Sequence, residues 1–146
     1  MKILVINGPN INMLGIREPE IYGRKTYEDL KECVENFSKE QGIEIEMYQS
    51  NIEGEIVNKI QEAYFEKVDG ILINPAAYTH TSIAILDAIK AVGIPTVEVH
   101  LTDINKREEY RKISYVSEAC MATFMGDGFA SYIDGIKSLL NINQHN

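Results

Sequence analysis

Two stretches of this sequence carry side chains suited to general acid–base chemistry. Glu98 and His100 lie two residues apart at the end of an apolar run, so in a strand their side chains share one face. A carboxylate beside an imidazole fixes the tautomer of the ring, which would prepare His100 to donate a proton. The alternative interpretation is a pair of polar residues at a strand end that hydrogen-bonds a loop.

The second stretch places Tyr22 five residues after Arg17. A phenol ionises only at about pH 10, so it is a poor base near neutrality. A guanidinium nearby stabilises the phenolate, and Arg17 could therefore make Tyr22 a base. The alternative is a loop tyrosine that packs on an arginine.

Arg17 and Tyr22 belong to a long polar segment, residues 7–23, which follows the apolar run Ile3–Ile6. Structureless segments of this length inside compact domains are usually functional or disordered. The sequence therefore predicts an active-site loop that can move, with Gly15 and Gly23 as its hinges.

Alternating elements must position these residues. β-Branched or alternating apolar runs predict strands over residues 3–6, 43–48, 70–73, 96–99 and 120–125. Apolar residues at helical spacing predict helices from Thr26 to Gly42 and over residues 53–67, 79–92, 105–112 and 129–140. The polar tail, residues 141–146, is expected to fray.

Strands that alternate with helices predict one α/β domain spanning residues 1–146. Five strands at this length favour a flavodoxin-like, doubly wound parallel sheet of order 2-1-3-4-5, with helices on both faces. Ligands of such sheets bind beyond the carboxyl ends of the strands. Asn74 and His80 follow the third strand and Thr102 follows the fourth, so they should gather with His100 at that edge.

Composition and missing motifs exclude several classes of function. The net charge of −8 argues against nucleic acid or an anionic membrane as the main partner. The chain has no G-x-G-x-x-G, P-loop or G-x-S-x-G motif, and its histidines lack zinc-site spacing, so no metal site is predicted. Cys33 and Cys120 show no disulfide framework and fit a cytoplasmic location, and no apolar stretch is long enough to span a membrane.

Three motifs resemble one known family. They are NGPNINMLGIREPEIYG over residues 7–23, NPAAYTHTS over residues 74–82 and EVHL over residues 98–101. Together they closely resemble type II 3-dehydroquinate dehydratase, and the similarity runs nearly end to end, through residues 107–111 and 114–115. The resemblance implies conversion of 3-dehydroquinate to 3-dehydroshikimate by loss of water, with no metal, organic cofactor or Schiff-base lysine.

The resemblance also implies the role of each residue. Tyr22 would take a proton from C2 of the substrate, and Arg17 would activate this tyrosine. Asn12 would hold a water that stabilises the enolate, while His100, oriented by Glu98, would protonate the leaving C1 hydroxyl. The substrate would be held by Asn74, His80, Asp87, Leu101, Thr102 and Arg111.

Two departures from the family pattern lie near the expected carboxylate pocket. Thr102 stands where serine is common, and its extra methyl group could crowd the substrate. Asp103 replaces a common asparagine and adds a negative charge. Both changes bear on affinity for an anionic substrate, whereas every implied catalytic group is present.

The resemblance further implies trimers that associate into a dodecamer. His80 and Asp87 are seven residues apart in the predicted helix over residues 79–92, about 10 Å along its axis. One small ring cannot easily touch both, so Asp87 is expected to reach the site of a neighbouring chain. Two alternatives stay open: a non-catalytic polyol-binding module on the same fold, and an acid–base hydrolase that uses His100 and Glu98.

Overall fold

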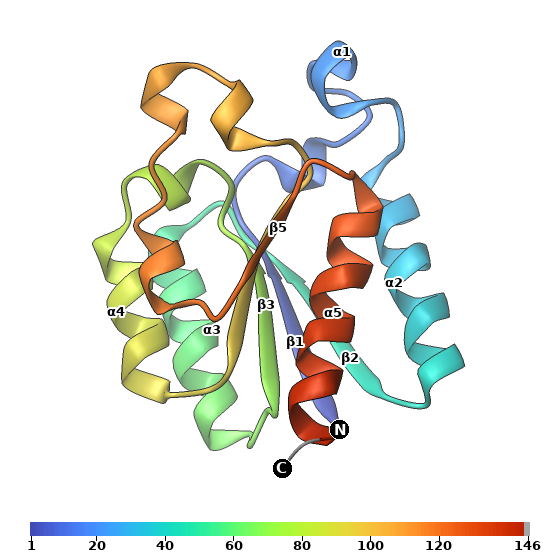
Figure 1. Ribbon diagram of the computed structural model, residues 1–146, viewed down its shortest axis with the longest axis vertical. Helices are drawn as coiled ribbons and strands as arrows, with labels where there is room; N and C mark the ends of the chain where they lie inside the picture. Colours follow the sequence, from blue (N-terminus) through green and yellow to red (C-terminus); the bar gives the residue numbers. More distant parts are fainter. Residues whose placement is uncertain (145–146) are drawn as a thin grey trace.

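The computed structural model describes residues 1–144 and contains a five-stranded parallel sheet of order β2-β1-β3-β4-β5 (Figure 1). The strands are β1 (Lys2–Asn7), β2 (Glu44–Gln49), β3 (Gly70–Asn74), β4 (Thr96–His100) and β5 (Thr123–Met125). The α-helices are α1 (Pro19–Tyr22), α2 (Tyr27–Gln41), α3 (Glu53–Phe65), α4 (Ile83–Val92) and α5 (Phe129–Gln144). The 3₁₀ turns are η1 (Ile11–Met13), η2 (Ala76–His80), η3 (Ile104–Lys106), η4 (Glu109–Arg111) and η5 (Val116–Ala119). The predicted flavodoxin-like order and the predicted edge position of the second strand are confirmed.

Helices cover both faces of the sheet, because successive strand residues point to opposite sides. Ile3 and Val5 of β1 pack with residues of α2 and α5, whereas Leu4 and Ile6 pack with residues of α3 and α4. Both clusters are closed to solvent, and each helix contributes one apolar stripe. The result is a three-layer sandwich that fixes the strand ends rigidly.

Local signals explain where the long helices begin. Thr26 and Asp29 form a reciprocal capping box at the start of α2, as their spacing predicts. At α4 the cap is Ser82, whose hydroxyl accepts a hydrogen bond from the Ile85 amide at 2.9 Å. The sequence prediction that this helix starts at residue 79 is therefore wrong, since residues 76–80 form the tighter turn η2.

Other predicted boundaries also differ from the structure. The helix predicted over residues 105–112 is instead the two turns η3 and η4, and the strand predicted from residue 120 begins at Thr123. Helix α5 continues to Gln144, beyond its predicted end at residue 140, and residues 145–146 lie outside the described part, so fraying of the tail stays a prediction. The predicted loop over residues 7–23 holds one short turn and the four-residue helix α1.

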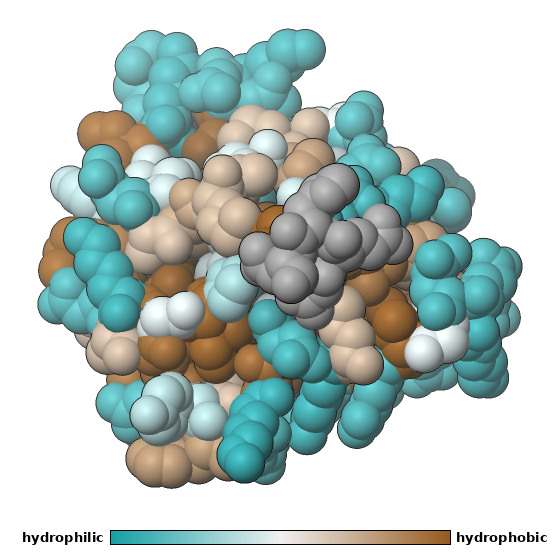
Figure 2. All heavy atoms as spheres, turned by 60° about the horizontal axis from the view of Figure 1, so that its bottom comes forward, coloured by the Kyte–Doolittle hydropathy of each residue, from teal (hydrophilic) through white to brown (hydrophobic). Residues whose placement is uncertain are grey.

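The two ends of the sheet differ in what they carry. Beyond the carboxyl ends of the strands, the loop with α1 and the segment between β4 and β5 rise together in Figure 1 and touch through a hydrogen bond from Arg107 to Tyr22. Figure 2 turns the amino-end side toward the reader, where hydrophobic residues extend across the middle of the face and hydrophilic ones lie mainly around its rim. Within residues 1–144, no helix combines the length and hydrophobicity needed to cross a bilayer.

Candidate active site

A pocket opens at the carboxyl ends of β1, β3 and β4, where the sequence places the candidate residues. Its lining includes most of the predicted side chains, namely Arg17, Tyr22, Asn74, His80, His100, Leu101, Thr102 and Arg111. The α1 loop supplies the first two, and the strand ends and the β4–β5 segment supply the others. Residues 85 positions apart in the chain are thus brought together, as Tyr22 and Arg107 illustrate.

His100 lines this pocket from the end of β4, and Glu98 lies two residues before it on the same strand. His100 Nε2 lies 3.2 Å from Glu98 Oε2, although the contact is off line for a hydrogen bond. Glu98 is completely buried and His100 is nearly so. The predicted shared face is therefore confirmed, with the carboxylate beneath the imidazole and the imidazole at the pocket wall.

The buried Glu98 carboxylate is surrounded by hydroxyl groups. Oε1 accepts hydrogen bonds from Thr79 (2.9 Å) and Ser114 (2.6 Å), and Oε2 accepts one from Ser117 (2.9 Å). Burial by itself would raise the pKa of this carboxyl group, but His100 and the hydroxyls of Ser114 and Thr79 bring the pKa below its ordinary value. Glu98 is therefore a carboxylate at neutral pH.

Tyr22 lies between two arginines. The Arg17 guanidinium is 4.9 Å from the centre of the phenol ring, and Arg107 Nη1 donates a hydrogen bond to the phenol oxygen at 3.1 Å. Arg107 also reaches Thr102 Oγ1 at 3.5 Å. In this geometry Arg107 contacts the oxygen itself, whereas Arg17 contacts the ring and pairs with Glu18 at 3.5 Å.

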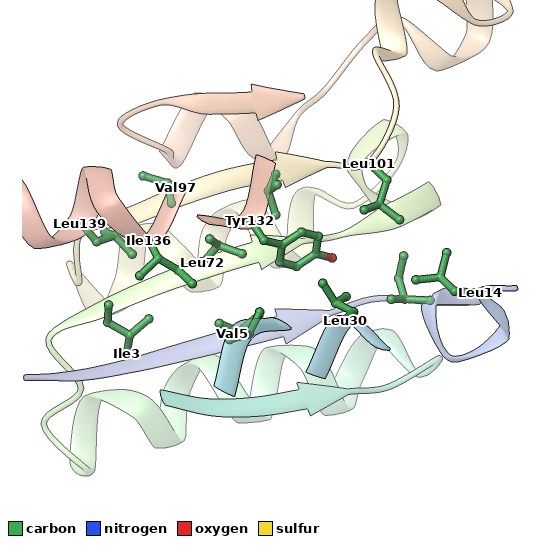
Figure 3. Close-up of a cluster of buried hydrophobic side chains, with 13 residues drawn as sticks. Ile3, Val5, Leu14, Leu30, Leu72, Val97, Leu101, Tyr132, Ile136 and Leu139 are labelled. Atoms are coloured by element: carbon green, nitrogen blue, oxygen red, sulfur yellow. The ribbon is translucent and has the colours of Figure 1, made fainter. Parts of the chain in front are cut away.

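Asn74 is fixed at the end of β3 by buried polar contacts. Its side-chain amide donates to the Tyr132 hydroxyl at 2.8 Å, and that hydroxyl donates to Asn7 at 2.6 Å. Figure 3 shows the Tyr132 ring inside the hydrophobic cluster, with its oxygen directed between β1 and β3. The side-chain oxygen of Asn74, Oδ1, accepts a hydrogen bond from the Ala76 amide at 3.1 Å, so the carboxamide has one defined orientation.

The chain is packed tightly where it passes this corner. A Cβ on Gly8 would lie 2.4 Å from the Pro75 carbonyl oxygen, so only glycine fits there. Ala76, which follows Pro75 in the chain, adopts a φ of 52°, a conformation that is strained for alanine. Because Ala76 lines the pocket, this strain lies at the site.

His80 and Arg111 also line the pocket. His80 Nδ1 lies 2.7 Å from the Ile113 carbonyl oxygen, which holds the ring in place. Burial lowers the pKa of His80, the Ile113 carbonyl opposes this shift, and the nearby His100 and Arg111 reinforce it. Arg111 Nε lies 2.9 Å from Glu108 Oε2, so this arginine is also anchored at the pocket edge.

Three predicted residues lie outside the pocket lining: Glu98, which is completely buried against His100, and the exposed Asn12 and Asp87. The Asn12 side-chain oxygen accepts a hydrogen bond from Gln49 at 3.3 Å on the exposed side of the loop. Asp87 is exposed on α4, whereas His80 belongs to η2, so the two do not share one α-helix as predicted. Their roles toward a substrate stay predictions.

Sequence reasoning missed two sets of residues. Arg107 received no role, although it follows the same strand end as Thr102. The hydroxyls around Glu98 were also missed, because Ser and Thr are too common to signal a contact 16 to 25 positions away. Among residues 1–144, no three His, Cys, Asp or Glu side chains gather in a way that could hold a metal ion.

Comparison with known proteins gives a consistent family. The family model described as dehydroquinase class II matches residues 1–140. A 3-dehydroquinate dehydratase of Clostridium acetobutylicum is 61% identical over 142 residues, covering 97% of this chain and 98% of the relative. One of Lachnoclostridium phytofermentans is 50% identical, covering 98% and 99% of the two chains.

Solved structures agree with this result. The type II dehydroquinase of Butyrivibrio crossotus superposes with a TM-score of 0.94 at 53% identity, covering 95% of this chain and 97% of that one. The enzyme of Propionibacterium acnes gives a TM-score of 0.90 at 38% identity, with 94% of each chain covered. Because the family model matches residues 1–140 and the relatives are similar over nearly their full length, the chain belongs to the class II dehydroquinase family.

Proposed function

We propose that this protein dehydrates 3-dehydroquinate to 3-dehydroshikimate, as its relatives' names indicate for them. The observation that carries the proposal is the pairing of Tyr22 with two arginines across the pocket from the Glu98–His100 pair. A β-elimination needs one group to remove a proton and another to protonate the leaving oxygen. A polyol-binding module would need neither.

The first step is removal of the C2 proton by the Tyr22 phenolate. The electron pair left at C2 is delocalised onto the neighbouring C3 carbonyl oxygen, which gives an enolate. Arg107 and Arg17 place positive charge at the phenol oxygen and ring, next to the group that takes the proton. The proposal thus adds Arg107 to the machinery that the sequence assigned to Arg17.

The second step expels the C1 hydroxyl. The enolate re-forms the carbonyl, the C1–O bond breaks, and the leaving oxygen takes a proton from His100 to become water. Glu98, a buried carboxylate below the ring, stabilises the imidazolium that donates this proton. The C2 proton remains on Tyr22 and the donated proton is missing from His100, so transfer through solvent restores both groups.

Binding is assigned to the remaining pocket residues. Arg111 and His80 face the substrate from one wall, Asn74 presents its oriented carboxamide from another, and the backbone at Leu101 and Thr102 would hold the carboxylate. Asn12 would hold a water beside the enolate oxygen. Because Asn12 lies outside the pocket lining, this role requires the loop to move inward.

Asp87 is proposed to act in the site of a neighbouring chain, within trimers that assemble into a dodecamer. Its exposed position on α4, outside its own pocket, supports this assignment. The test mixes Asp87→Ala and Tyr22→Phe proteins under conditions that exchange subunits. A shared site predicts activity above either parent, because some mixed sites recover both groups, whereas activity at the parental level excludes the shared site.

The activity itself is tested with purified protein and 3-dehydroquinate. The product is a conjugated enone, so ultraviolet absorbance should rise as it forms. The control is His100→Ala protein at the same concentration, for which the rise should be at least about 100-fold slower. Absence of any rise with the wild-type protein would reject the proposed function.

A further inference from the structure

Four hydroxyl groups converge on Glu98 from four separate segments. Thr79 comes from η2, Ser114 from the stretch before η5, Ser117 from η5 and Thr123 from β5. Thr123 is the most distant, at 3.5 Å from Oε2. Hydrogen bonds to a buried carboxylate favour its charged form. These four hydroxyls, here called the Glu98 cage, therefore stabilise the charge of Glu98.

The cage is held by its own local contacts. Ser114 Oγ accepts a hydrogen bond from the Ser117 amide at 3.2 Å, at the start of η5. The Tyr115 amide donates a hydrogen bond to the Thr79 carbonyl oxygen at 2.8 Å. Val116, between the two serines, is completely buried in the cluster that contains α3 and α4. The buried Val116 therefore anchors the segment that carries the two partly buried serines.

The two carboxylate oxygens have different neighbours. Thr79 and Ser114 both donate hydrogen bonds to Oε1, and their hydroxyl oxygens lie 2.7 Å apart. If one of the two hydroxyls is lost, the other still donates to Oε1. Ser117 serves Oε2, the same oxygen that faces His100 Nε2 at 3.2 Å. Ser117 is consequently the hydroxyl whose loss most directly changes the atom in contact with the imidazole.

We propose that Ser117, supported by Ser114 and Thr79, is a positioning residue that keeps Glu98 ionised and aimed at His100. Through Glu98, it maintains His100 as the proton donor of the elimination. This inference rests on the role of His100 in the proposed function. Ser117 itself lies outside the pocket lining, so its effect would pass through Glu98 and His100.

Other charged or titratable groups also surround this pair. Cys120 faces Glu98 from the end of η5, and burial raises the pKa of its thiol to about 12, so it stays neutral. His80 on η2 and Arg111 on η4 lie near His100, and Arg17, Tyr22 and Arg107 line the same pocket. None of these groups changes in a Ser117 variant, which isolates the effect of the hydroxyl.

The experiment compares Ser117→Ala and Ser117→Thr with wild type. Losing a hydrogen bond to a charged group predicts a fall of about tenfold in kcat, with KM unchanged. With one donor fewer, Glu98 takes up a proton more readily, so the acidic limb of the kcat–pH profile moves to higher pH. Threonine keeps the hydroxyl and should return both kcat and the limb toward wild type.

A second measurement needs no turnover. In substrate-free protein labelled with ¹³C at glutamate carboxyls, the Glu98 resonance, assigned with Glu98→Gln, should titrate at higher pH in Ser117→Ala. The matched control is Ser38→Ala, which removes a hydroxyl that donates to the Ile43 carbonyl at 2.6 Å, remote from the pocket lining. This control should move neither the resonance nor the kcat profile.

The two measurements separate this inference from the proposed function. If the Glu98 resonance of Ser117→Ala titrates at the same pH as in wild type, Ser117 does not help to keep Glu98 ionised, whatever the activity of the variant. A moved resonance with an unmoved kcat profile would overturn the link from the cage to catalysis. Absence of any absorbance rise with the wild-type protein would instead reject the proposed function, a result that leaves the titration of the Glu98 resonance unaffected.

Discussion

The two walls of the pocket are built in opposite ways. The strand wall, defined as Asn74, Glu98 and His100, is buried, and contacts from several elements fix Asn74 and Glu98. The loop wall, defined as Arg17 and Tyr22, belongs to residues 7–23, where α1 buries none of its residues. The proposed acid, His100, therefore lies on a rigid strand, whereas the proposed general base, Tyr22, lies on an exposed loop.

This difference teaches how one fold can combine preorganisation with access. A carboxylate buried beneath the acid must be matched by donors before substrate arrives, because an unpaired buried charge is very costly. The loop has no such requirement, since its polar groups can be solvated. It can therefore admit a substrate and then bring Tyr22 to C2. Gly15, at a φ of 86°, fits the predicted hinge role, and its movement stays a prediction.

The largest expected effect is the loss of either catalytic group. Tyr22→Phe and His100→Ala should each reduce kcat by at least about 100-fold, the usual scale for removing a general base or acid. The comparison of the walls adds that Tyr22→Phe should lower the free energy of unfolding by no more than about 1 kcal/mol, because its hydroxyl makes a single part-buried hydrogen bond, to Arg107. Steady-state kinetics and urea unfolding check the two statements. Wild-type turnover in either variant would remove its assigned role.

The second prediction concerns stability of the strand wall against pH. The pKa of Glu98 is lowered on folding, so its charge stabilises the protein above the ordinary value of 4.5 and this stabilisation disappears as pH falls through the lowered value. Glu98→Gln should therefore cost about 2 kcal/mol at pH 7. The cost should shrink below pH 4.5. Urea unfolding of both proteins at several pH values measures this, and a cost independent of pH would contradict an ionised Glu98.

The third prediction tests which arginine serves the phenol oxygen. Arg107→Lys keeps the positive charge but loses the planar fork that reaches both Tyr22 and Thr102, so kcat should fall by about tenfold. Arg17→Lys should have a smaller effect than Arg17→Ala, since lysine retains charge over the ring. Equal losses in Arg107→Lys and Arg17→Lys would show that the two guanidiniums are not distinguished in the way the contacts indicate.

The sequence predicted the strand wall far better than the loop wall. Strand periodicity alone places Glu98 and His100 on one face and Asn74 at a neighbouring strand end, and the structure brings them to one edge. Helix α1 was missed, although Pro19 at its first turn is a known start signal, because four residues carry too little periodicity. The Glu98 cage and the Tyr132 contact with Asn74 depend on chain reversals that no local pattern encodes.

The start of α4 illustrates the same limit more closely. Thr79 and Ser82 are both capable of capping, and apolar spacing does not decide between them. Tertiary contacts do: the Thr79 hydroxyl bonds Glu98, so only Ser82 is free to cap the Ile85 amide. The prediction failed because Thr79 serves the site and not the helix.

The smallest expected effect completes the comparison of the walls. Ile16 in the loop is 72% exposed, whereas Val116 beside the Glu98 cage is completely buried. Ile16→Ala should change the free energy of unfolding by less than about 0.5 kcal/mol, because an exposed side chain loses no packing. Val116→Ala removes buried methyl groups and should cost about 2 kcal/mol. Urea unfolding measures both, and a similar cost at the two positions would mean that the loop is as much part of the core as the segment beside the Glu98 cage.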